Sequence, residues 1–182
     1  MAIQRVTVFG GARPRPGEPA YEEAHRLGRL LARAGYTVLT GGYAGTMEAV
    51  SRGAQEAGAH VIGMTCDEIE NWRQVGRNPW VVEEIRFPSL RQRLLAMIES
   101  CDAALALPGG AGTLAEISMM WNHLITAAIP PRPLILIGPQ WKSAFDCYFS
   151  ILGDYTSQPD KDWLSFVPDN EAAIQFLESL QK

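Results

Sequence analysis

The sequence is poor in the residues on which disulfide frameworks, metal sites and lysine chemistry depend. It contains only three cysteines, three histidines and three lysines in 182 residues. Cys66, Cys101 and Cys147 form no CxxC pair, so the sequence predicts neither a disulfide framework nor a zinc site. We expect all three to be small buried apolar residues in a reducing compartment.

The histidines also lack the spacing of metal ligands. His25, His60 and His123 fall on separate predicted helix or loop positions. We expect them to be structural or solvated, with no metal and no cofactor bound.

Excess positive charge and long apolar runs are missing as well. The formal net charge is −4, which argues against non-specific binding to nucleic acid or an acidic membrane because such binding needs a basic surface. There is no apolar run of membrane-spanning length and no charged-then-apolar leader. We therefore expect a cytoplasmic protein without a nucleic-acid or membrane partner, although a local basic pocket remains compatible with this charge.

The remaining composition is that of a globular domain. Hydrophobic residues make up 47% and charged residues 20%, which argues against disorder. A chain of this length can bury a substantial core without disulfides, and no repeat, linker or low-complexity tract divides it. We expect one nucleotide-binding α/β domain over residues 1–182.

The most informative stretch is Ala104–Glu116. It begins as a short apolar run, passes through three glycines between 109 and 112, and continues with apolar residues at helical spacing. This pattern predicts a strand, a tight turn and a helix. Glycines let backbone amides approach a ligand closely, and the first amides of a helix lack internal partners, so a phosphate is the expected occupant.

Glu116 is expected in the first turn of that helix, on the rim of the same pocket. The positive end of the helix dipole would favour its ionised form there. The alternative is that the glycines only make a sharp connection and that Glu116 is an ordinary carboxylate at a helix start.

Two further glycine turns support a ligand site. The predicted strand Tyr36–Thr40 runs into Gly41–Glu48, which has the same order of strand, glycines, Gly-Thr and acidic residue. The predicted strand Ile3–Phe9 ends at Gly10-Gly11, and Arg13 and Arg15 follow. Open α/β sheets bind ligands beyond the carboxyl ends of their strands, which favours a ligand role for Arg13. The alternative is that both arginines belong to a solvated basic loop, and this alternative applies slightly more to Arg15 than to Arg13.

Strand and helix patterns alternate along the chain. Apolar runs of strand length lie at 3–9, 36–40, 61–64, 104–107, 133–138 and 163–167. The alternation predicts an α/β fold with a doubly wound, Rossmann-like, mostly parallel sheet and helices on both faces. In a strand order three-two-one-four-five, the three glycine turns converge on one crevice where the winding reverses.

The alternation pauses at 65–79, a polar segment of the kind that covers a site or reaches a second subunit. Residues 80–87 could add a strand. Within this region we expect Trp72 and Trp80 to act mainly through packing.

Pro108–Glu116 resembles the PGGxGTxxE motif of the LONELY GUY (LOG) family. The Gly10-Gly11 turn, the Gly41–Ala49 loop and Arg93 are similar to family features in the same order, so the resemblance covers nearly the whole chain. Characterised members are phosphoribohydrolases, which release a free base and ribose 5-phosphate from cytokinin riboside 5′-monophosphates or related nucleoside monophosphates.

The resemblance implies roles for particular residues. Glu116 would stabilise the positive charge that develops on the ribose, and Arg93 would bind substrate or hold Glu116 ionised. The substrate and its phosphate would lie against Gly10, Gly11, Arg13, Gly42, Gly45, Thr46, Gly109, Gly110, Ala111, Gly112 and Thr113. The alternative for Arg93 is a surface helix residue paired with an acid such as Glu99.

One residue departs from the family pattern. Characterised cytokinin-activating members usually have lysine after the arginine, whereas Leu94 follows Arg93 here. The missing ammonium weakens the expectation that the same substrate is used.

The resemblance also leaves competing expectations. Lys142, Lys161 and Lys182 lie outside the glycine loops, which argues against the pyridoxal lysine decarboxylase label carried by the family. Related proteins include molybdenum-cofactor carriers and nucleotide sensors, so binding without turnover is the alternative. A homodimer or larger assembly is implied too, with the predicted helix 113–128 and its Met119, Met120 and Trp121 as a surface.

Overall fold

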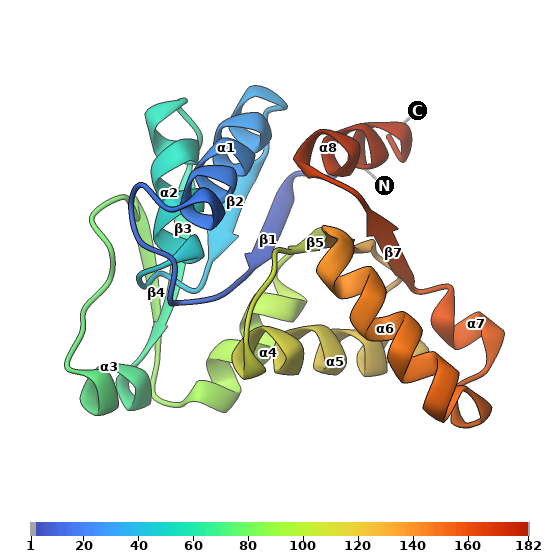
Figure 1. The fold of residues 1–182 in the computed structure, drawn as a ribbon. Coiled ribbons are helices and arrows are strands. Elements are labelled where there is room, and N and C mark those ends of the chain that lie inside the picture. Colours follow the sequence, from blue (N-terminus) through green and yellow to red (C-terminus); the bar gives the residue numbers. More distant parts are fainter. Residues whose placement is uncertain (1–2, 182) are drawn as a thin grey trace.

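A computed structural model of the chain describes residues 3–181. Seven strands alternate with helices, and a short 3₁₀ helix, η1, follows α6 (Figure 1). The elements in chain order are β1 (Arg5–Phe9), α1 (Pro19–Arg33), β2 (Thr37–Thr40), α2 (Thr46–Glu56), β3 (Val61–Cys66), α3 (Asp67–Arg73), β4 (Glu83–Phe87), α4 (Leu90–Glu99), β5 (Ala103–Ala106), α5 (Ala111–Ile125), β6 (Leu134–Ile137), α6 (Pro139–Leu152), η1 (Gly153–Tyr155), α7 (Gln158–Lys161), β7 (Leu164–Val167) and α8 (Asn170–Ser179).

The strands form one parallel sheet in the order β4-β3-β2-β1-β5-β6-β7. In the register of the central strand, Val6 pairs with Val38 of β2 on one side and with Ala103 of β5 on the other. The winding reverses between β1 and β5, which confirms the predicted doubly wound, Rossmann-like topology. The segment at 80–87 does contribute a strand, β4, at the edge of the sheet.

Helices cover both faces of the sheet. In Figure 1, α1, α2 and α8 lie on one side, and α4, α5 and α6 lie on the other. Side chains alternate between the two cores along each central strand: Val6, Val8 and Leu105 join the first core, and Phe9 and Ala106 join the second. The buried apolar strands that predicted a parallel sheet thus supply both faces of the core.

Two local expectations need correction. The helix that carries the glycine motif runs over Ala111–Ile125 rather than 113–128. Cys66 and Cys101 are buried as predicted, but Cys147 is exposed on α6.

Within residues 3–181, no helix is long and apolar enough to cross a membrane. The three histidines lie apart: His25 contacts Glu56, and His60 contacts Glu83. His123 contacts the Met119 carbonyl one turn earlier on α5. These contacts agree with the structural or solvated roles predicted for the histidines.

Candidate active site

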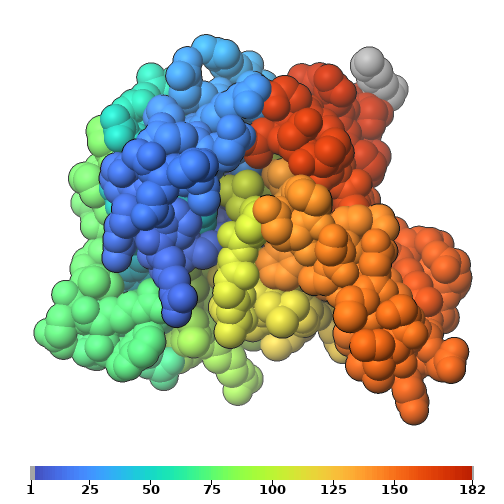
Figure 2. All heavy atoms as spheres, viewed as in Figure 1, coloured from blue at the N-terminus to red at the C-terminus, as the bar shows by residue number. Residues whose placement is uncertain are grey.

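A cleft of about 840 Å³ opens beyond the carboxyl ends of β1 and β5, at the point where the sheet reverses. Its walls come from the β1–α1 loop, the β5–α5 turn, α3 and α4, together with Tyr43 of the second glycine loop and Met47 of α2. In Figure 2 the blue amino-terminal loop and the yellow start of α5 border a recess on this face. The residues that line the cleft are Gly10, Gly11, Ala12, Arg13, Pro14, Tyr43, Met47, Glu68, Ile69, Trp72, Arg73, Leu90, Arg93, Leu94, Pro108, Gly109, Gly110, Ala111, Gly112, Thr113, Ala115 and Glu116.

The amino terminus of α5 forms one wall. Gly110 precedes the helix, and its carbonyl accepts the first helical hydrogen bond, from the Leu114 amide at 3.0 Å. The amides of Ala111, Gly112 and Thr113 come before that bond and lack partners within the helix. Gly110, Ala111 and Gly112 are exposed at the cleft, so their backbone can bind an anion, as the motif predicts.

Arg93 reaches the cleft from α4 and is only 4% exposed. Its Nε donates to the Met64 carbonyl at 2.6 Å, and Nη2 donates to the Gly41 carbonyl at 3.1 Å. Its guanidinium also lies over the Tyr43 ring, 5.7 Å from the ring centroid. The alternative of a surface arginine paired with an acid such as Glu99 is therefore wrong.

Gly41 has a steric function that its place in a glycine-rich loop did not reveal. A Cβ atom at this position would collide with the Arg93 guanidinium and press on the Met47 sulfur. Glycine at 41 thus leaves room for the arginine that its own carbonyl binds.

Glu116 faces Arg93 across the cleft. Its Oε1 lies 3.8 Å from Nη1 of Arg93, which is an ion-pair distance but too long for a hydrogen bond. The side chain is 11% exposed, and no described residue donates a hydrogen bond to its carboxylate. A ligand hydroxyl or a water molecule can therefore bind to this carboxylate.

Burial raises the pKa of Glu116 to about 7, and the positive charge of Arg93 opposes this rise. The expectation of an ionised carboxylate in the first turn is wrong on two counts. α5 begins at Ala111, so Glu116 starts the second turn, where the dipole is weaker. Loss of hydration also outweighs the favourable charges around the carboxylate.

The second glycine loop supports the site from behind. Thr46 donates to the Gly11 carbonyl through both its amide and its hydroxyl, each at 2.9 Å. Gly45 has φ +78°, and a Cβ there would collide with Gly11 and Ala12. The structure therefore does not bring Gly42, Gly45 and Thr46 to the cleft wall; Gly45 and Thr46 instead pack against the first glycine turn.

The polar segment at 65–79, expected to cover a site or reach a second subunit, contributes a wall of the cleft through α3, but its individual site residues were not predicted. Glu68, Ile69, Trp72 and Arg73 line the cleft, and Trp72 is 75% exposed, so it does not serve as a packing anchor. The polar segment at 65–79 was the available signal, because it interrupts the strand and helix alternation next to the predicted crevice. An interruption alone does not tell which side chains turn towards the site.

Leu90 and Leu94 continue the apolar part of the wall from α4. The structure places Leu94 in the cleft, at the position where the family pattern has lysine. The departure therefore puts an apolar side chain in place of a cation at this one position of the cleft, which Arg13, Arg73 and Arg93 also line.

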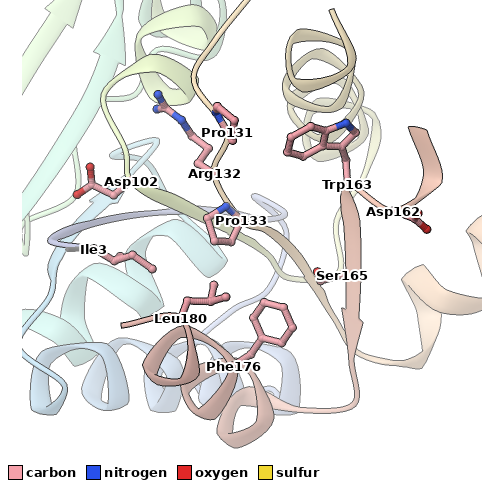
Figure 3. A pocket seen from close by; sticks show the side chains of 10 residues that line it. All are labelled: Ile3, Asp102, Pro131, Arg132, Pro133, Asp162, Trp163, Ser165, Phe176 and Leu180. Atoms are coloured by element: carbon pink, nitrogen blue, oxygen red, sulfur yellow. The ribbon is translucent and has the colours of Figure 1, made fainter. Parts of the chain in front are cut away.

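A second hollow, of about 360 Å³, lies at the amino ends of the strands (Figure 3). The Asp102 carboxylate accepts the Gln4 and Arg5 amides, and Arg132 donates to the Ile98 and Glu99 carbonyls. In Figure 3 the Asp102 and Arg132 side chains point away from the apolar floor of this hollow. The Asp102 and Arg132 side chains are thus committed to the backbone, whereas the cleft at β1 and β5 holds a buried acid, a buried arginine and a helix amino terminus together.

Fold and cleft together define a Rossmann-like α/β protein with a glycine-lined ligand cleft at its topological switch point. Within that class, the chain belongs to the SLOG cluster4 family, whose model matches residues 4–128. The match confirms the resemblance to LOG proteins.

Relatives of known name are similar over much of the chain. A probable cytokinin riboside 5′-monophosphate phosphoribohydrolase of Oryza sativa subsp. japonica is 35% identical over 116 residues, 63% of this chain and 46% of that protein. The cytokinin riboside 5′-monophosphate phosphoribohydrolase of Rhodococcoides fascians is 30% identical over 135 residues, 72% of this chain and 66% of that protein. The pyrimidine/purine nucleotide 5′-monophosphate nucleosidase of Escherichia coli (strain K12) is 32% identical over 163 residues, 85% of this chain and 34% of that protein. The chain thus spans about half the length of the rice relative.

Solved structures share the fold. The molybdenum cofactor carrier protein of Chlamydomonas reinhardtii has a TM-score of 0.74 at 24% identity, with 99% of each chain covered. The molybdenum cofactor binding protein of Rippkaea orientalis has a TM-score of 0.77 at 23% identity and covers 100% of this chain and 99% of that one. Likeness at this level of identity shows the architecture alone.

Proposed function

We propose that the protein is a nucleoside 5′-monophosphate N-ribohydrolase that releases a free base and ribose 5-phosphate. The observation that carries this proposal is the buried Glu116 carboxylate facing Arg93 at 3.8 Å in the same cleft as the α5 amino terminus. The names of the rice, Rhodococcoides and Escherichia relatives support this reaction class.

The phosphate would bind at the start of α5. The amides of Ala111, Gly112 and Thr113 supply donors, and the helix dipole favours an anion there. Gly10 and Gly11 line the cleft beside the β5–α5 turn, and Arg13 adds positive charge. Binding energy at the phosphate would position the ribose beside Glu116.

The reaction breaks the bond between ribose C1′ and the base nitrogen. The electron pair leaves with the base, and positive charge develops on the ribose ring. The ionised Glu116 carboxylate stabilises that charge and binds a ribose hydroxyl or the attacking water. Water then adds to C1′ and passes a proton to the Glu116 carboxylate, whose pKa of about 7 lets it accept the proton at neutral pH. The departing base takes up a proton, and Glu116 gives up its own, so that the products are the neutral base and ribose 5-phosphate and the carboxylate is restored.

Arg93 keeps this carboxylate usable. Its guanidinium is fixed by the Met64 and Gly41 carbonyls, so it stands beside Glu116 without moving. Its charge lowers the cost of ionising a buried acid. We assign Glu116 the catalytic role and Arg93 a charge-positioning role.

The base would lie against the apolar part of the cleft. Trp72 and Ile69 of α3 and Leu90 and Leu94 of α4 offer flat and aliphatic surfaces suited to a purine. With leucine at 94, no ammonium from this position would read the base or the phosphate. We therefore propose a purine nucleotide, AMP-like, as the substrate class, with cytokinin-type nucleotides as one member of the test panel.

We also propose a cytoplasmic, single-domain protein that assembles as a homodimer. Met120 is buried, and Trp121 packs against Phe145 and Phe149, so neither is a free contact residue. The exposed apolar residues of α5 are instead Leu114, Met119 and Ile125. A second copy of this chain covering them would explain why three large apolar side chains face outward on one helix.

The second candidate is a nucleotide or molybdenum-cofactor carrier without turnover. The carrier proteins among the solved structures favour it only through their shared fold. Burial shifts the pKa of the Glu116 carboxyl towards neutrality, so the group can gain or lose a proton, which a hydrolase can use. In a carrier of anions the ionised carboxylate would only repel the ligand.

The discriminating experiment incubates the purified protein with AMP, isopentenyladenosine monophosphate and a pyrimidine monophosphate. Chromatography measures free base, and calorimetry measures binding of the same ligands. Release of base with ribose 5-phosphate supports the hydrolase. Tight binding of a nucleotide or of the molybdenum cofactor with no base released from any nucleotide favours the carrier.

A further inference from the structure

A third hollow, of about 580 Å³, adjoins the cleft. The two share the lining residues Ala12, Arg13, Tyr43 and Arg73, so they lie next to each other, and we call the two together the trough. The residues of α5 line only the cleft, whereas Arg15 lines only the hollow. The hollow is therefore a part of the trough that the start of α5 does not line. We call it the arginine hollow, after Arg13, Arg15 and Arg73.

Its charge is unlike that of the chain as a whole. The net charge is −4, yet three exposed arginines line this one concavity. In the part of the chain that the structure describes, none of the three forms a salt bridge, whereas Arg26, Arg52, Arg77, Arg86 and Arg93 do. The acid that lines the hollow is Glu48, which accepts a hydrogen bond from the Tyr21 hydroxyl at 3.2 Å.

Local contacts hold two of these arginines near the hollow. The Arg73 guanidinium lies over the Trp72 ring, 4.9 Å from its centroid. The Arg15 amide donates to the Glu18 carboxylate at 3.0 Å, which fixes the loop from which the Arg15 side chain projects. Because the guanidinium groups themselves lack acidic partners, they are available to an anion from outside the protein.

We propose that the arginine hollow binds a second phosphate group of the nucleotide whose first phosphate lies on the α5 amides. This inference deepens the proposed function and rests on it for the placement of the first phosphate. A nucleoside monophosphate has a phosphate for the α5 amides only, whereas a nucleotide with a suitably placed second phosphate group can also reach the arginine hollow. Guanidinium groups are suited to phosphate because each offers paired donors and a fixed positive charge.

The experiment is isothermal titration calorimetry with four probes. AMP is the one-phosphate reference. ADP places the second phosphate next to the first, adenosine 3′,5′-bisphosphate places it on the sugar, and diadenosine pyrophosphate places it in a linkage to a second nucleoside. We expect at least one two-phosphate probe to bind roughly tenfold more tightly than AMP, and to lose this advantage as salt rises. The probe with the largest advantage identifies where the second phosphate is attached.

Two variants assign the effect to the hollow. Arg15→Ala should reduce the affinity advantage of the best two-phosphate probe over AMP to about one. Arg33→Ala removes the same charge from the exposed last turn of α1, outside both hollows, and should preserve the advantage. Circular dichroism of both variants checks that the fold is intact.

The outcomes separate this inference from the proposed function. Equal affinities for all four probes, or an advantage that survives Arg15→Ala, would overturn the second phosphate site, whether or not AMP is hydrolysed. A two-phosphate advantage that depends on Arg15, with no base released from any nucleotide, would support the site and overturn the hydrolase.

Discussion

At the scale of single residues, Glu116 determines what the cleft can do. Its carboxylate is buried, close to one guanidinium and without a hydrogen-bond donor among the described residues. Burial raises its pKa to about 7, so the ionised form becomes dominant only above neutral pH. A group in this condition can change protonation state during a reaction.

The first prediction concerns pH. If the ionised carboxylate acts on the ribose, kcat/KM rises as pH increases through about 7 and reaches a plateau above it. Initial rates of base release between pH 5 and 9 measure this profile. A rate that falls over the same range would show that the protonated form is the active one.

The same shift predicts a stability effect of the opposite sign. A carboxyl whose folded pKa is raised stabilises the fold fully below its unfolded pKa, and this contribution is lost as pH rises through the folded pKa near 7. Glu116→Gln should therefore raise the free energy of unfolding more at pH 8 than at pH 5, by about 2 kcal/mol, because the pKa of about 7 already includes the attraction to Arg93. Urea unfolding at both pH values is the measurement. An equal change in the free energy of unfolding at pH 5 and pH 8 would contradict the raised pKa of Glu116.

Arg93 offers a second prediction. Arg93→Met leaves the Met64 and Gly41 carbonyls without their donor and Glu116 without its countercharge, so the protein should lose about 2 kcal/mol of stability or more. Arg91→Met, an exposed position on the same helix, is the matched control and should change stability little. Thermal unfolding of both variants is the measurement. Equal melting temperatures for Arg93→Met and Arg91→Met would contradict the buried, hydrogen-bonded position of Arg93.

At the scale of elements, α3 makes the cleft deeper and supplies Trp72. Stacking of a base on this exposed indole predicts that a nucleotide quenches part of the tryptophan fluorescence and that Trp72→Ala weakens nucleotide binding roughly tenfold. Trp163→Phe, at the distant hollow of Figure 3, serves as the control and should leave the quenching in place. Quenching that persists in Trp72→Ala would place the base elsewhere.

The elements also show how far the sequence could predict the site. The β5–α5 turn was predicted because its glycines and the periodicity that follows are local signals. The hydrogen bond from Thr46 to the Gly11 carbonyl was not predicted, because it joins residues 35 apart in the sequence and depends on how two loops pack. For the same reason, the burial of Arg93 and Glu116 could not be predicted from helical periodicity alone.

At the scale of the whole molecule, the sheet order brings distant segments to one edge. Strand patterns and the right-handed crossover rule were sufficient to predict the doubly wound topology. They did not predict α3 or the edge position of β4, because short polar helices and edge strands have weak sequence signals. The outward apolar face of α5 also required the structure, since Met120 and Met119 differ in burial but not in type.

That face leads to a prediction on assembly. Met119→Glu should convert a dimer to a monomer, because a charge would be buried in the interface. Ile151→Glu, at an exposed apolar position of α6, is the control and should leave the dimer intact. Light scattering coupled to size exclusion gives the masses. A wild-type monomer, or a dimer that survives Met119→Glu, would contradict an interface on α5.

The central claim is that a buried carboxylate in a glycine-lined cleft cleaves the bond between a base and a phosphorylated ribose. Its most direct test compares base release from AMP by the wild-type protein and by Glu116→Gln, with AMP affinity measured for both. The account predicts that the substitution reduces kcat by at least roughly a hundredfold while the Kd for AMP changes little. Base release that continues at the wild-type rate in Glu116→Gln would contradict it.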